Sequence, residues 1–391
     1  MRTFSLNLFL FLFSTLAFAA EPISFLPLPV FATLPNEGPT YGFMPVFLDS
    51  DAETSRIKSI IAPSFTWNKV SRYSLTGRYF RYPSEYEDQI FQATYSTRIF
   101  KEVILDRAVQ VTKKNVITNY QSFLYRADPY RRFFGIGQHT AQSDETSYTL
   151  ETLRAGAKTG YNFTDTFNLN VGVNIQQLEP KLEGVEGLRQ TLIEYASRKD
   201  MTRARSGSLI VGLRYDSRPL REYSWKGLLI DLSMGGALSS QAKEGRYGIT
   251  KAEVRWHLPE TAALCLVSRV YWGYYSGSEI PFLEQHSLGG SSALRGFTLD
   301  RFIDQGAWVV DIEQRIIAKR FQIEGSVVEL HIDPFLSLGQ VYHDGSQFFE
   351  RTQFTQGLGF RAFAPPNVIG RIDIARDESE FNVYVELGHP F

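Results

Sequence analysis

Residues 327–342 alternate between apolar and polar side chains, and the polar face is charged. Val328, Leu330 and Ile332 share one face, whereas Glu329 and Asp333 lie on the other. A period of two residues predicts a β-strand. A soluble sandwich would have to bury one of these faces, and an unpaired buried charge is costly. A transmembrane barrel avoids this cost, because its apolar face contacts lipid and its polar face lines a wet lumen.

The same alternation recurs along the chain in segments of about ten residues. Around Ile312, for example, Asp311, Glu313 and Arg315 share the polar face. We predict an all-β fold, an antiparallel transmembrane β-barrel with sixteen strands, because single-chain bacterial barrels have even strand numbers. A further segment, 99–112, is either a seventeenth strand or an extension of its neighbour. The sixteen strands are expected at 40–48, 58–67, 72–80, 88–98, 116–127, 146–158, 165–177, 206–217, 226–238, 246–257, 263–275, 307–318, 327–342, 354–363, 367–376 and 380–391.

The N-terminus has the pattern of a secretory signal peptide. Arg2 precedes an apolar stretch over 6–13, and the small-residue site Ala17-Phe18-Ala19 follows. We expect a signal peptide over 1–19, an extended lead-in over 20–39 and the barrel over 40–391. Beyond residue 20 no apolar run reaches the length of a spanning helix, so the exported chain is expected to cross the bacterial outer membrane as strands.

Composition favours strands and excludes several classes of site. Aromatic residues make up 14% of the chain, which suits the aromatic girdles of a barrel. The single cysteine, Cys265, excludes an intrachain disulfide and a cysteine-rich zinc site. The net charge of -1 gives no support to nucleic-acid binding, so no nucleic-acid partner is expected.

Enzyme motifs are absent from the sequence or incomplete. There is no G-x-S-x-G, H-E-x-x-H or P-loop motif, and the six histidines do not have the spacing of metal ligands. We therefore predict that the protein is not an enzyme, with no catalytic residues, no metal and no cofactor. His286 beside Ser287 is the nearest candidate for a hydrolase site, which keeps an outer-membrane hydrolase as the weakest alternative.

The long connection 276–306 contains the segment SLGGSSALRGF, Ser287 to Phe297. Its LRGF core resembles the (V/I/L)RGF signature of the BamA/TamA-type superfamily, also called bacterial surface antigens. In that family the sixth extracellular loop folds back into the barrel. Further family-like pieces follow the family's order, so the resemblance extends from about residue 40 to the C-terminus. These pieces are RRFFGIGQHTAQSDETSY from Arg131, LRYDSRPLREYSWKG from Leu213, GLGFRAF from Gly357 and VYVELGHPF from Val383.

The resemblance implies that the loop arginine docks on the next two strands. In the family its partners are a glutamate and an F-x-D-x-G pattern, which correspond here to Glu313 and to 335–339. Ser337 replaces the aspartate, so Arg295 is expected to lose its second carboxylate. Alternation independently places Glu313, Phe335 and Ser337 on the lumen face. The expected loop dock comprises Leu294, Arg295, Gly296, Phe297, Glu313, Phe335, Ser337 and Gly339.

The C-terminal strand ends in Phe391 after a series of outward-facing apolar residues. This ending resembles the terminal signal that the barrel-assembly machinery reads during biogenesis. The predicted assembly signal comprises Val383, Val385, Leu387 and Phe391.

The resemblance implies a protein that aids the insertion or passage of polypeptide or lipid at the outer membrane, in contact with outer-membrane lipid. The physical basis would be a weak seam between the first and last strands, because unpaired strand edges template other strands. Full machines of the family carry periplasmic POTRA domains, which we expect this chain to lack, so a separate periplasmic partner stays open. The alternative is a passive pore or structural surface protein.

Overall fold

The computed structural model describes most of the 391-residue chain. The described residues are 24–34, 36–51, 57–84, 86–109, 113–219, 224–323, 326–364, 368–376, 381–387 and 390. The predicted signal peptide, 1–19, and Phe391 lie outside them. Within the described part, no helix is both long and apolar enough to cross a membrane.

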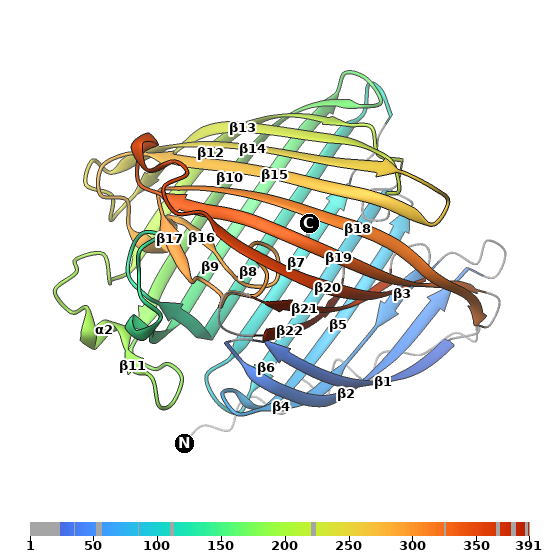
Figure 1. Ribbon diagram of the computed structural model, residues 1–391, viewed down its shortest axis with the longest axis horizontal. Coiled ribbons are helices and arrows are strands. Elements are labelled where there is room, and N and C mark those ends of the chain that lie inside the picture. The colour runs from blue at the N-terminus through green and yellow to red at the C-terminus, as the bar shows by residue number, and fades with distance from the viewer. Residues whose placement is uncertain are drawn as a thin grey trace.

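Antiparallel strands make up most of the molecule, and most of them pair with the next long strand along the chain (Figure 1). They are β1 (Ser24–Leu34), β2 (Gly38–Ser50), β3 (Ile57–Ile61), β4 (Ser64–Asn68), β5 (Arg72–Ser84), β6 (Glu87–Ser96), β7 (Lys101–Val109), β8 (Ile117–Phe133), β9 (Thr146–Asn162), β10 (Phe167–Lys181), β12 (Ala204–Asp216), β13 (Gly227–Ser239), β14 (Arg246–Pro259), β15 (Leu264–Ser276), β18 (Gly306–Ile323), β19 (Ser326–Tyr342), β20 (Gln353–Ala364), β21 (Val368–Arg376) and β22 (Phe381–Leu387). The sheet curls until β22 lies beside β1. The predicted all-β barrel is confirmed.

Short elements occupy the connections. They are η1 (Gln142–Asp144), β11 (Arg189–Gln190), α2 (Thr191–Glu194), η2 (Phe282–Glu284), β16 (His286–Leu288), β17 (Phe302–Asp304) and η3 (Gly345–Gln347). The long connections 134–145, 182–203 and 277–305 lie at one end of the strands, and short turns such as 163–166 lie at the other. Outer-membrane barrels have long extracellular loops and short periplasmic turns, so the end with the long connections is the extracellular one.

The predicted number of sixteen strands is not confirmed. All sixteen predicted segments are strands, with β3 and β4 sharing the segment between β2 and β5, and the described sheet contains β1 and β7 in addition. β1 lies within the predicted lead-in. Its prolines at 27 and 29 argue against a strand when the sequence is read alone, because proline is tolerated only at the edges of sheets. β7 corresponds to the segment that the sequence left open.

Burial along the last strands is the reverse of that in a soluble protein. On β19, Ile332 is 38% exposed and Asp333 is 0% exposed. The same reversal holds on β18, where Ile312 is exposed and Glu313 is buried, and on β21, where Ile372 is exposed and Asp373 is buried. Apolar side chains therefore cover the outer surface and charged side chains fill the interior, as a barrel in lipid requires.

Candidate functional site

The connection between β15 and β18, residues 277–305, packs inside the wall of the barrel. Its two short strands form a hairpin in which Ser287 pairs with Ile303 and Leu288 pairs with Phe302. Between them lies the LRGF segment. Figure 1 shows β16 and β17 beside β18 at the extracellular end.

Two glycines allow the tight path of this loop. Gly296 has a φ of 119°, in the region that favours glycine. Gly289 has a φ of 114°, and a Cβ atom there would collide with the backbone oxygen of Thr298. The tip therefore turns without side-chain clashes and brings Arg295 to the strands.

Arg295 is 1% exposed and contacts three of the wall strands. Its Nη1 atom donates to Glu313 Oε2 at 3.3 Å and to Asp373 Oδ2 at 3.1 Å. Its Cζ atom lies 3.4 Å from the centroid of the Phe335 ring. The guanidinium is thus held by two carboxylates and stacked on an aromatic face, an arrangement suited to arginine.

The carboxylates that receive Arg295 belong to a larger buried ion network. Glu313 also accepts from Arg315 at 3.1 Å and from Arg361 at 2.9 Å. Arg361 in turn donates to Asp333 at 2.7 Å and lies 3.4 Å from Asp373. Buried charges are tolerated when they are paired and hydrogen-bonded, so the network stabilises the interior only while its members remain together.

Asp373 corrects the expectation that Arg295 has one carboxylate partner. Ser337 donates a hydrogen bond to Asp311. The second carboxylate is Asp373 on β21, which is not one of the two strands that the family resemblance implied. Asp373 is buried on the inner face of β21 together with Arg371 and Ala375, but periodicity alone does not show which inner residues the loop reaches. Sequence reasoning placed Asp333 on the lumen face but not in the dock, and it missed Arg361.

The last strand holds the backbone of the LRGF segment. The amide of Gly296 donates to the Tyr384 hydroxyl at 2.9 Å, and that hydroxyl lies 3.2 Å from the Phe297 carbonyl oxygen. The Asn382 side chain donates to the Gly296 carbonyl oxygen. The loop therefore spans the inner face from β18 to β22.

Apolar packing anchors the same loop against β18 and β19. Leu294 and Phe297 pack with Leu288, Phe302, Val309 and Val341 in one buried cluster. A Cβ atom at Gly339 would lie 2.9 Å from the Trp308 carbonyl oxygen and 3.3 Å from Leu294, so glycine leaves room for the leucine. All eight predicted dock residues thus lie in one region, with Ser337 beside Asp311 rather than Arg295.

The segment from Arg131 meets this loop at the extracellular end. Arg131 forms an ion pair with Asp300 at 2.8 Å, and Arg301 donates to the Thr140 carbonyl oxygen at 2.7 Å. The Gly137 amide donates to the Ile303 carbonyl oxygen at 2.8 Å. The family-like piece that begins at Arg131 therefore contacts the same connection, 277–305, that carries the LRGF segment.

The candidate hydrolase pair does not have the geometry of a nucleophile and its base. His286 is buried and Ser287 is exposed, because successive residues of β16 face opposite sides. The imidazole stacks on Tyr275 with ring centroids 4.1 Å apart. Burial lowers the pKa of His286 to about 3, which keeps the ring neutral.

The predicted C-terminal signal is only partly described. Val383 and Val385 are half-buried on β22, on the opposite face from the buried Tyr384. Leu387 ends the strand, whereas Phe391 lies outside the described residues.

Comparison with known proteins identifies the family. Residues 76–355 match the Omp85 superfamily domain. The structure is similar to BamA from Haemophilus ducreyi lacking POTRA domains 1–3, with a TM-score of 0.52 and 12% identity over 88% of this chain and 74% of that chain. CdiB from Acinetobacter baumannii and CdiB from Escherichia coli match at 12% and 11% identity with TM-scores of 0.47 and 0.48, over 95% of this chain and 60% and 67% of theirs. No curated protein matches the sequence.

The family match covers more than half of the chain, and the BamA match shows the same fold. The resemblance first seen at the LRGF segment is thereby confirmed. The protein belongs to the Omp85 superfamily and is an integral outer-membrane β-barrel of the assembly and translocation type.

Proposed function

We propose that this barrel aids the insertion or passage of polypeptide or lipid at the outer membrane, through the seam between β1 and β22. The observation that carries the proposal is the contrast between this seam and the rest of the sheet. Backbone pairing joins the consecutive long strands, but within the described residues none joins β22 to β1, although the two lie side by side.

The sequence of β1 supports a weak seam. Amide groups two residues apart point to the same edge of a strand, so Pro27 and Pro29 remove two donors from one edge. β1 pairs with β2 over its whole length, and proline is tolerated only where its missing donor faces away from a ladder. This places the two missing donors on the edge toward β22. An edge with unpaired groups is also a template for an incoming strand.

The inward loop has a complementary role in this proposal. It bridges β18 to β22 through Arg295, Tyr384 and Asn382, so it steadies the last strand from inside while the seam remains weak. Its bulk inside the lumen also favours this function over a passive pore, which needs an open channel.

A photo-crosslinking experiment in cells tests the proposal. A photoreactive residue replaces Phe31 on β1 or Phe381 on β22, which are 58% and 67% exposed near the extracellular end of the seam. The matched control is Phe354, an exposed phenylalanine at the same end of β20. We expect adducts with polypeptide or lipid at the two seam positions and few at Phe354. Equal labelling at all three positions would contradict use of the seam.

Biogenesis is expected to depend on the C-terminal signal and the barrel-assembly machinery. Deleting Phe391 should lower the assembled fraction at native expression without preventing export. Heat-modified gel migration measures the assembled fraction.

A partner that supplies a periplasmic module belongs to the same proposal, and affinity capture after crosslinking from the periplasmic turn 260–263 would identify it. Absence of any periplasmic adduct would count against such a partner.

A further inference from the structure

The outer wall formed by β8, β9, β10, β12 and β13 has a hollow that lies near the extracellular ends of β12 and β13 and about midway along β8 and β9. One register row crosses these five strands and alternates between large and small side chains. In order, it contains Phe123, Ala155, Ile175, Gly207 and Leu238. Large residues therefore stand on both sides of each small one.

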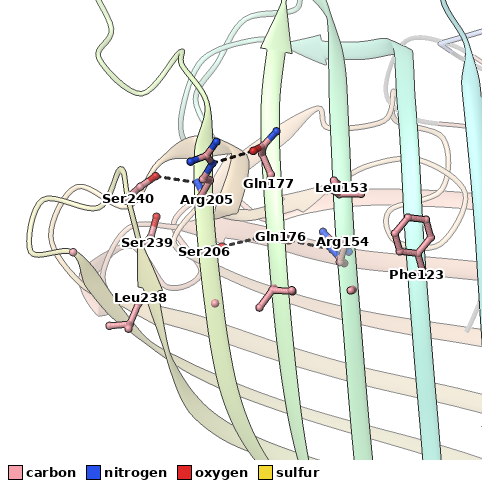
Figure 2. Close-up of a pocket in the computed structure, with 14 residues that line it drawn as sticks. Phe123, Leu153, Arg154, Gln176, Gln177, Arg205, Ser206, Leu238, Ser239 and Ser240 are labelled. Atoms are coloured by element: carbon pink, nitrogen blue, oxygen red, sulfur yellow. Dashed lines mark hydrogen bonds between the residues drawn. The ribbon is translucent and has the colours of Figure 1, made fainter.

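The hollow is a cavity of about 670 Å³, within the range of ligand pockets, roughly 300–1,000 Å³. Its walls include Ile175 and, as Figure 2 shows, Leu153 and Leu238. Ile175 is 65% exposed and Leu238 is 70% exposed, as expected of side chains that face lipid. The next residue of β10, Gln176, accepts a hydrogen bond from Arg154 and donates one to Ser206. The cavity is thus an apolar groove that opens toward the membrane.

The fold does not require glycine at the bottom of this groove. A Cβ atom at Gly207 would meet its nearest neighbour, the Ile175 side chain, at 3.8 Å, which is ordinary contact. A larger residue therefore fits at this position, and the space beside Gly207 is left open by side-chain choice rather than by backbone geometry.

A cation without a carboxylate partner lies at the extracellular end of the groove. Arg205 Nε donates to Gln177 Oε1 at 3.0 Å, and its backbone amide donates to the Ser240 hydroxyl at 2.9 Å (Figure 2). Among the described residues, no carboxylate lies within 4 Å of its guanidinium. The neighbouring cations differ, because Arg203 and Lys181 both pair with Glu179, at 2.7 and 2.5 Å.

On β12 the groove lies near the extracellular end of the strand, and in an outer-membrane barrel this end faces the outer leaflet. Gly207 is three residues from the start of β12, and the long connection 182–203 precedes that strand on the extracellular side. An apolar groove with an uncompensated cation at its headgroup end matches a lipid with an acyl chain and an anionic phosphate. We propose that this groove binds a phosphorylated glycolipid of the outer leaflet, with one acyl chain beside Gly207 and a phosphate on Arg205.

Native mass spectrometry of the purified full-length barrel tests the proposal, with hexa-acylated, bis-phosphorylated lipid A as the probe. Gly207→Leu fills the groove, and Arg205→Gln removes the cation. We expect Gly207→Leu to abolish lipid A retention and Arg205→Gln to weaken it roughly tenfold, the ratio for one lost charge-assisted hydrogen bond.

Matched controls separate the groove from general effects on the barrel. Gly236→Leu places the same side chain on the outer face of β13, where a Cβ atom has only a contact at 3.7 Å, outside the groove. Arg203→Gln removes a neighbouring cation that is already paired. Both should retain lipid A, and heat-modified migration confirms that all four variants fold. Equal retention by the wild type and all variants would overturn the proposal. Selective retention of phosphatidylglycerol over lipid A, with the same sensitivity to Gly207→Leu, would overturn its assignment to a glycolipid.

Discussion

The wall formed by β18 to β21 and the wall formed by β9 and β10 share one sequence pattern but differ in what covers their inner face. Glu313, Asp333 and Asp373 on the first wall are buried beneath the inward loop. Arg154 and Asn174 occupy equivalent inner positions on the second wall and are exposed. Alternation thus decides which face a charged residue takes, and the loop decides whether that residue is buried.

This difference determines the contribution of each charge to stability. An exposed ion pair contributes about 0–1 kcal/mol, whereas breaking a buried pair costs about 3–5 kcal/mol because a charge is left without compensation. We therefore expect substitutions of lumen charges to be severe under the loop and mild on the open wall.

The largest effect is expected for Glu313→Gln, because Glu313 serves Arg295, Arg315 and Arg361 together. The free energy of unfolding should fall by about 3–5 kcal/mol in urea titrations of the barrel in lipid vesicles.

The control for Glu313→Gln is Asp231→Asn on β13, outside the wall formed by β18 to β21. Asp231 is half-buried and lies 3.9 Å from Arg214, so its loss should cost about 0–1 kcal/mol. Equal losses for the two substitutions would show that cover by the loop does not control the energy.

An intermediate effect is expected for Ser337→Asp, which introduces the carboxylate of the family pattern. Arg295 already has Asp373, and Ser337 lies against Asp311, so the new charge would face a buried carboxylate. We expect a loss of about 1–3 kcal/mol, since like charges in a buried site repel. Unfolding of the matched Ser337→Asn variant, which adds no charge, gives the reference, and a gain in stability for Ser337→Asp would contradict this interpretation.

Ser337 and Asp373 mark the limit of what the sequence could predict. The period of two identified all sixteen predicted strands and the inner positions of Glu313 and Phe335, because side-chain direction is a local property of a strand. Asp373 lies 78 residues from Arg295, and the choice between it and Ser337 depends on how the loop tip lies across several strands. β1 was missed for a local reason, since its prolines resemble those of a linker.

The smallest effect is expected for Tyr384→Phe, which keeps the buried ring and removes the hydroxyl that binds Gly296. Losing this hydrogen bond should cost about 1 kcal/mol and modestly increase cleavage of the loop by proteinase K. Tyr215→Phe on β12, remote from the loop, is the control. Identical cleavage of wild type and Tyr384→Phe would show that β22 does not hold the loop.

The most direct test of the loop dock is a double-mutant cycle with Arg295→Ala and Glu313→Gln. The readout is proteinase K cleavage within 277–305 of the refolded barrel, converted to the free energy of loop opening. Each single change should expose the loop, and the double change should add little, with a coupling of about 1.5–3 kcal/mol. Cleavage equal to wild type in all three variants would show that Arg295 does not hold the loop against the wall.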